Sequence, residues 1–243
     1  MNPGTLMRTA AAALAAWAAA GVFGGGPAAC ASDAAARAAS AAAGPPTLCF
    51  PIDIGDARSL PWTNDGPDPA YDAPVRLVDD VLALLKSDAD PLVRMETLRR
   101  ATFYAYGLGA PPCAPAVAQA LRLALAERAL DAEAAGVGVA AAWLDAAWAE
   151  ACRGDLREAP ALRPYAWLTR ARVALGREDA AYEFAAAVLT HHARALGREA
   201  LEPKHAGHVR RAAQLAADGS QVAKNLLARF GSAQTDLRKL REG

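Results

Sequence analysis

The chain has 243 residues, and its 26 Lys and Arg residues balance 26 Asp and Glu residues, which leaves no net charge. No overall electrostatic field therefore attracts nucleic acid or an anionic membrane surface, and a nucleic-acid-binding function is disfavoured. Hydrophobic residues make up 53% of the chain, but many of them are alanines, which favour helix and bury little surface, so the composition predicts a mostly helical protein.

The first 31 residues have the features of a secretory signal peptide. Arg8 precedes the uncharged run TAAAALAAWAAAGVF, and an A-x-A-like cleavage site ends at Ala31. The run is shorter and richer in alanine than a membrane-spanning helix requires. We therefore expect an exported protein, periplasmic or secreted, with no stable membrane insertion after cleavage. The alternatives are a retained anchor and a lipid anchor at Cys30, because this stretch loosely resembles the lipobox of bacterial lipoproteins.

A single folded domain is expected over residues 47–243, behind an Ala-rich, low-complexity linker at 32–46 that ends in Pro-Pro. Residues 47–73 contain several prolines and glycines and show no helical period, which predicts an irregular N-terminal strap. Apolar side chains would pack this strap along the helices that follow it. They are Cys49, Phe50, Ile52, Ile54, Leu60 and Trp62.

Residues 74–231 read as consecutive helices with clear start and stop signals. Asp72 and Pro74 start the first helix, Asp90 and Pro91 start the second, and Gly107 ends the second. Further helices are expected at 115–131, 137–152, 161–175, 178–196, 204–217 and 220–230, followed by a tail at 232–243. The short loops between them predict antiparallel helix pairs, and therefore an all-α fold.

Residues 75–108 resemble one HEAT-type repeat, the paired-helix unit of a family of α-solenoids. The resemblance lies in the aliphatic first helix, in the turn Asp90-Pro91-Leu92-Val93-Arg94 and in the spacing of the second helix. It implies that Asp90 and Arg94 tie neighbouring repeats together, as the matching residues do in that family. The later helix pairs lack this turn, so an irregular HEAT-like solenoid and a helical bundle both stay open.

The commonest local signatures of enzymes are missing from this sequence. It contains no H-E-x-x-H, C-x-x-C, P-loop or G-x-S-x-G motif. The segment Gly136-Val137-Gly138 imitates part of the dinucleotide-binding fingerprint, but the segment before it reads as helix rather than strand. We therefore expect a non-catalytic protein without a cofactor, and a helix-to-helix turn at these glycines.

All four histidines fall in one short window, at the end of one expected helix and the start of the next. They are His191, His192, His205 and His208. His205 and His208 share a helix face, and Glu199 and Glu202 lie in the connecting loop, so a metal site is one interpretation. The other is that these histidines are helix-end or solvated residues, since nearby Lys and Arg side chains would repel a cation.

Three cysteines remain after the predicted cleavage: Cys49, Cys113 and Cys152. An oxidising compartment would allow one disulfide, which would join Cys49 of the strap to Cys113 or Cys152 of the helices. The alternative is that Cys113 and Cys152 are small core residues.

Aromatic residues gather at the end of the second helix, and most of them are expected to be buried in the core. Tyr104 and Tyr106 cannot both face the same side, so we expect one of them to be exposed. An exposed Tyr104 beside Arg99 and Arg100 would form an edge that binds a partner.

These features together predict an exported, non-catalytic protein that binds or scaffolds a protein or peptide partner through stacked helical hairpins. Two alternatives remain. One is a metal-binding protein or metalloenzyme that uses the hairpin from His191 to His208. The other is a structural subunit of a larger assembly, which would present a large exposed apolar face.

Overall fold

The computed structural model describes residues 50–86, 88–108, 113–155, 163–191, 199–231 and 236–242. The predicted signal peptide (1–31), the predicted linker (32–46) and the alternative lipid-anchor site Cys30 lie outside these ranges. None of the helices within them combines the length and the apolar character needed to cross a bilayer.

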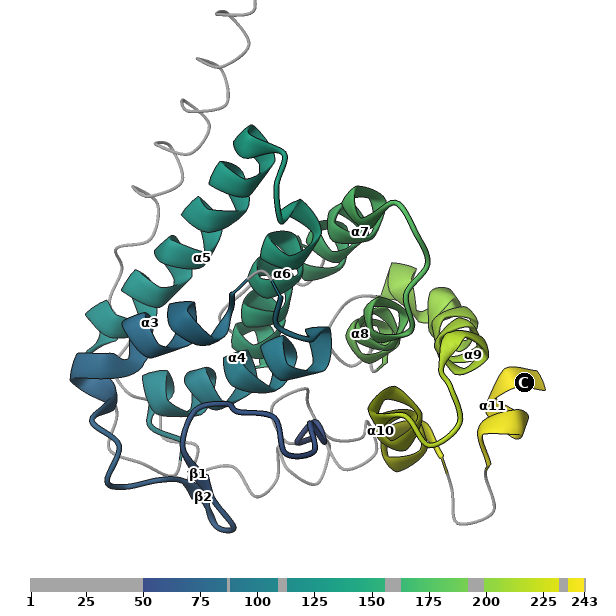
Figure 1. Cartoon of the computed structure of the whole chain (residues 1–243), viewed down its shortest axis with the longest axis horizontal. Coiled ribbons are helices and arrows are strands. Elements are labelled where there is room, and N and C mark those ends of the chain that lie inside the picture. The colour runs from purple at the N-terminus through teal and green to yellow at the C-terminus, as the bar shows by residue number, and fades with distance from the viewer. Residues whose placement is uncertain are drawn as a thin grey trace, which may run out of the picture. The chain divides into compact units, whose positions relative to one another are not determined.

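Helices make up most of the described residues, which confirms the all-α prediction (Figure 1). The helices are α3 (Ala73–Leu84), α4 (Pro91–Tyr106), α5 (Pro115–Ala135), α6 (Val139–Asp155), α7 (Arg163–Leu175), α8 (Ala180–Thr190), the 3-10 helix η2 (Glu199–Lys204), α9 (His205–Leu215), α10 (Gln221–Phe230) and α11 (Leu237–Glu242). The strap adds one antiparallel pair of two-residue strands, β1 (Trp62–Thr63) and β2 (Gly66–Pro67).

The helices begin and end largely where local signals predict. The Asp90 carboxylate accepts a hydrogen bond from the Leu92 backbone N–H at 2.8 Å, so it caps α4, and Pro91 follows as its first residue. Gly107 ends α4 in the left-handed conformation at φ 68°, which a residue without Cβ adopts at little cost. Gly136 ends α5 in the same way, so the predicted helix-to-helix turn is confirmed there.

The boundaries of α8 differ most from the prediction of one helix over 178–196. Asp179 caps its start by accepting from the Ala181 backbone N–H at 2.9 Å. The helix ends at Thr190, and His191 has an extended backbone with φ −65° and ψ 135°. The Thr190 hydroxyl donates back to the Ala186 carbonyl, one turn earlier in the helix, at 2.7 Å.

The core is centred on α8, in which every residue from Ala181 to Thr190 is buried. This helix contacts α4, α6, α7, α9 and α10, and α6 also packs against α4, α5 and α7. Alanines at the crossings let these helices approach closely, and Trp148 and Phe184 fill the space between them. Cys113 and Cys152 are buried as predicted, whereas Cys49 lies outside the described residues, so its disulfide stays a prediction.

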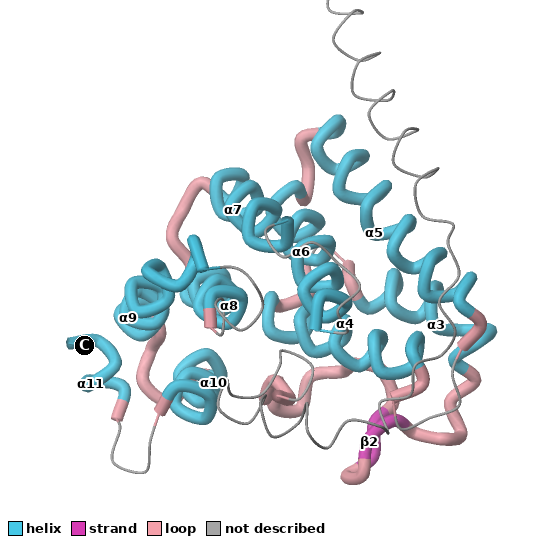
Figure 2. Tube along the Cα trace, turned by 180° about the vertical axis from the view of Figure 1, so that it is seen from behind, coloured by secondary structure: helices cyan, strands magenta, loops and turns pink. Residues whose placement is uncertain are grey.

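The strap runs from beside α10, along α4, to the β1–β2 pair (Figure 2). Its backbone is bound by side chains of both helices. Asn225 of α10 accepts from the Asp53 N–H at 2.8 Å and donates to the Asp53 carbonyl at 2.7 Å. Farther along, the Arg100 guanidinium donates to the Leu60 carbonyl at 2.7 Å and the Tyr104 hydroxyl donates to the Pro61 carbonyl at 2.6 Å. The strap is therefore an ordered part of the domain.

Candidate functional site

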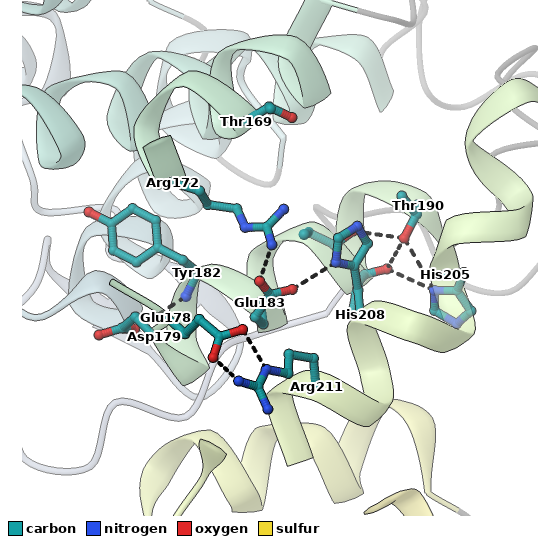
Figure 3. Close-up of polar contacts among 12 residues, drawn as sticks. Thr169, Arg172, Glu178, Asp179, Tyr182, Glu183, Thr190, His205, His208 and Arg211 are labelled. Atoms are coloured by element: carbon teal, nitrogen blue, oxygen red, sulfur yellow. Dashed lines mark hydrogen bonds and ion pairs between the residues drawn. The ribbon is translucent and has the colours of Figure 1, made fainter. Parts of the chain in front are cut away.

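A buried polar cluster joins α7, α8 and α9, with Glu183 at its centre (Figure 3). The Glu183 side chain is only 3% exposed, forms an ion pair with Arg172 of α7 and accepts from Nδ1 of His208 of α9 at 2.7 Å. Burial alone would raise the pKa of Glu183, but the hydrogen bond from His208 and the charge of Arg172 outweigh it, so the pKa is lowered. Glu183 is thus an ionised carboxylate with both oxygens engaged.

His208 continues this cluster to a third side chain, Tyr165, whose hydroxyl lies 2.9 Å from Nε2 of His208. The order carboxylate, imidazole, hydroxyl is also that of hydrolytic triads. A nucleophile needs a lowered pKa or a base that removes its proton. Here burial raises the pKa of Tyr165, the Arg172 charge opposes this and the Glu183 charge adds to it. The phenol stays protonated, so the geometry supports a tie between three helices better than a nucleophile.

His191 and His205 form a separate pair, with Nδ1 of His191 lying 3.2 Å from Nε2 of His205. Nδ1 of His205 is 3.0 Å from the Ala187 carbonyl and must carry the proton in that hydrogen bond. Both rings also pack edge-on against Phe230, with centroids 5.2 Å apart. The pair is therefore part of an aromatic contact between α8, α9 and α10.

The three predicted metal ligands that the structure describes, His191, His205 and His208, are not gathered at one point. His205 and His208 point to different partners, and His192 lies outside the described residues. Within the described ranges, no group of three or more His, Cys, Asp or Glu side chains is placed to hold a metal ion. The metal hypothesis stays a prediction, and His191 with His205 is the only pair among the four that the described residues bring together.

Acidification is expected to destabilise the fold through His205. Burial lowers the pKa of His205 below its usual 6.5, and the charges of His208 and Arg229 act in the same direction. As the pH falls through 6.5, the unfolded chain binds a proton at this position and the folded chain does not, so the free energy of unfolding falls. Urea unfolding between roughly pH 5 and 7 should show a flatter profile for His205→Gln than for the wild type; parallel profiles would contradict this.

The prediction that Arg99, Arg100 and Tyr104 form an exposed edge is wrong for Arg99 and Tyr104, which are buried. Arg99 is 3% exposed and Tyr104 is 1% exposed, because the strap covers this side of α4. Both arginines bind Glu96, which is also buried: Nε of Arg99 lies 2.7 Å and Nε of Arg100 lies 2.8 Å from its carboxylate oxygens. These residues hold the strap to α4, and of the three only Arg100, at 19% exposure, is partly open to solvent.

Arg94 joins α4 to the two helices beside it. Its guanidinium forms an ion pair with Asp145 of α6 at 2.7 Å, and both side chains are 1% exposed. It also donates to the carbonyls of Leu85, Lys86 and Ala89, which follow α3. Arg94 therefore does contact a neighbouring helix pair, while Asp90 caps its own helix.

A groove of about 250 Å³ lies between the strap and α3. We call it the strap groove. One wall is the strap segment 58–61, and the other is α3 with the residue that follows it. The α3 side contributes Arg76, Asp80, Ala83, Leu84 and Lys86.

The charges in the strap groove are unbalanced. Its one acid, Asp80, accepts from the Tyr71 hydroxyl at 2.9 Å and forms an ion pair with Arg76 at 3.2 Å. Arg58 and Lys86 are exposed and form no ion pair with any residue that the structure describes. The groove thus offers two cations to a ligand.

Comparisons with protein-family models, with curated proteins and with solved structures find no match to this chain. The choice between the Glu183 cluster and the strap groove as the functional site therefore rests on their geometry. Nothing in the sequence indicates the strap groove, because one wall is an irregular segment whose path along α3 no local pattern specifies. Two of the buried acids had a visible signal, since Asp145 and Glu183 are the only charged residues in the apolar, Ala-rich runs 139–149 and 180–190.

Proposed function

We propose that this chain is a non-catalytic binding protein that holds a segment of a protein partner in the strap groove. The observation that carries this proposal is the pair of cations, Arg58 and Lys86, which line opposite walls of the groove without a counter-ion among the described residues. The proposal includes a site of action outside the cytoplasm, which the signal-peptide features of residues 1–31 support.

Binding fits the described sites better than turnover does. In the polar cluster, Glu183 is engaged by two partners and Tyr165 has a raised pKa. In the strap groove, the one carboxylate is held by Tyr71 and Arg76. General acid–base catalysis needs a group that can exchange a proton with a ligand, and these groups are occupied by the protein itself.

The size of the strap groove favours a segment of polypeptide as the ligand. Pockets for small molecules typically enclose about 300–1,000 Å³. The strap groove has about 250 Å³, and its walls combine apolar surface from Pro61, Ala83 and Leu84 with charge at Arg58 and Lys86. Such a groove accommodates a few side chains of an extended segment.

The exposed apolar residues favour this proposal over a structural subunit. Among the described residues, the large hydrophobic side chains with the greatest exposure are Val75, Leu123, Val137 and Val173. They belong to three different helices, α3, α5 and α7, and to the turn that precedes α6. A subunit of a larger assembly would gather such residues on one face.

Filling the strap groove should abolish partner binding. Ala83 is exposed on α3 and lines the groove, so Ala83→Trp would occupy it without disturbing the core. Peptides selected from a displayed random library on the wild-type chain should fail to bind Ala83→Trp. The matched control is Ala120→Trp on the exposed side of α5, which should bind them as the wild type does. Selected peptides that bind both variants equally would show that the partner uses another surface.

A further inference from the structure

We infer that the segment bound in the strap groove is an extended peptide that carries acidic side chains. This inference rests on the proposed function and specifies its ligand. It follows from the charges of the groove, from the way its walls are held and from the kinds of side chain between them.

The excess of positive charge belongs to the groove and not to the whole protein. The chain as a whole is neutral, with 26 basic and 26 acidic residues. Several other surface cations have acidic partners: Arg170 pairs with Glu133, Arg211 with Glu178 and Arg241 with Asp218. Arg58 and Lys86 differ from these, because no described carboxylate lies within ion-pair distance of either.

Buried and half-buried side chains hold the backbone on both sides of the groove. On the strap, Arg100 and Tyr104 bind the carbonyls of Leu60 and Pro61, and the Ser59 hydroxyl lies 2.9 Å from that of Thr97. These contacts lie directly after Arg58 in the chain.

The α3 wall is held in the same manner. Arg94 donates to the Lys86 carbonyl, and Arg128 donates to the Leu85 carbonyl. The backbones that carry the two cations are therefore fixed before a ligand arrives, which reduces the entropy lost on binding.

The chemistry of the groove favours an acidic peptide over a nucleic acid. Nucleic-acid sites combine many cations with aromatic side chains on which bases stack. The strap groove has two unpaired cations and no aromatic side chain in its lining, and Pro61, Ala83 and Leu84 provide apolar contact between the charges. Carboxylates of Asp or Glu, flanked by apolar residues, complement such a surface.

The inference is tested with two fluorescent probe peptides, one that alternates Glu with Leu and a twin that alternates Gln with Leu. Fluorescence anisotropy should show that the wild-type chain binds the Glu peptide about tenfold more tightly than the Gln twin, which is about 1.4 kcal/mol. This advantage should shrink with added salt, because exposed charges are screened. In Arg58→Gln/Lys86→Gln it should fall to at most about twofold.

A charge-matched control separates the groove from the net charge of the chain. Lys224→Gln/Arg238→Gln removes two exposed cations from α10 and α11 and should keep the preference of the wild type. Circular dichroism checks that both double variants are folded.

Three other outcomes would each overturn the inference. Equal binding of the two peptides, or no binding of either, excludes an acidic ligand. Library peptides that bind the wild type but not Ala83→Trp would still support the proposed function. A preference that survives in Arg58→Gln/Lys86→Gln places the acidic ligand elsewhere. An oligonucleotide that binds more tightly than the Glu peptide, and depends on the same two cations, makes the groove a nucleic-acid site.

Discussion

Replacing Asp145 with asparagine is expected to lower the free energy of unfolding by about 3–5 kcal/mol, because Arg94 would keep a buried charge without its counter-ion. The two side chains are 1% exposed and 2.7 Å apart, so water cannot replace the lost carboxylate. Arg128 lies 3.4 Å from the same carboxylate oxygen and would lose it too. Since α3, α4 and α6 meet at this point, the whole domain should be affected and not one helix alone.

Urea unfolding measures this effect as a shift in the midpoint at unchanged slope. Asp131→Asn on the exposed surface of α5 makes the same chemical change without burial, and should alter the stability by less than about 0.5 kcal/mol. A loss below about 1 kcal/mol for Asp145→Asn would mean that Arg94 is not a buried, paired charge in solution.

Replacing Glu96 with glutamine is expected to detach the strap from α4 and to lower the free energy of unfolding by about 3 kcal/mol. Glu96 is 1% exposed, binds both Arg99 and Arg100 and accepts from the Ile52 backbone N–H at 3.0 Å. A neutral amide leaves Arg99, which is 3% exposed, without its charge partner. It also leaves Arg100 less firmly placed to hold the Leu60 carbonyl.

Hydrogen exchange at the Ile52 amide reports the docking of the strap, and should become faster in Glu96→Gln while amides at the centre of α8 keep most of their protection. Because the strap is one wall of the groove, peptide binding should weaken in parallel. Glu127→Gln on the exposed surface of α5 is the control and should change neither property. Unchanged exchange at Ile52 in Glu96→Gln would show that Glu96 does not hold the strap.

The helices could be predicted because their ends are encoded locally. Asp90 and Pro91 start α4 through one cap and one fixed backbone angle, and Gly107 ends it through its left-handed conformation. The end of α8 was missed because no such signal stands there. His191 leaves the helix and packs against His205 and Phe230, which are remote along the chain.

The site could not be predicted because it depends on the path of the strap. The sequence showed that residues 47–73 are irregular and carry apolar side chains, but not that their backbone is bound by Glu96, Arg100 and Tyr104. That path buries the side chains predicted to bind a partner. It also brings Arg58 close to α3, a proximity that no periodicity along the chain can reveal.

The most direct test of the account is an amide NMR titration of the chain from residue 47 onward with the peptide that alternates Glu with Leu. The account predicts saturable shifts in the strap at residues 58–61 and near the end of α3 at residues 83–86, the two walls of the groove. Shifts confined to α9 and α10, or no saturable shifts at all, would contradict it.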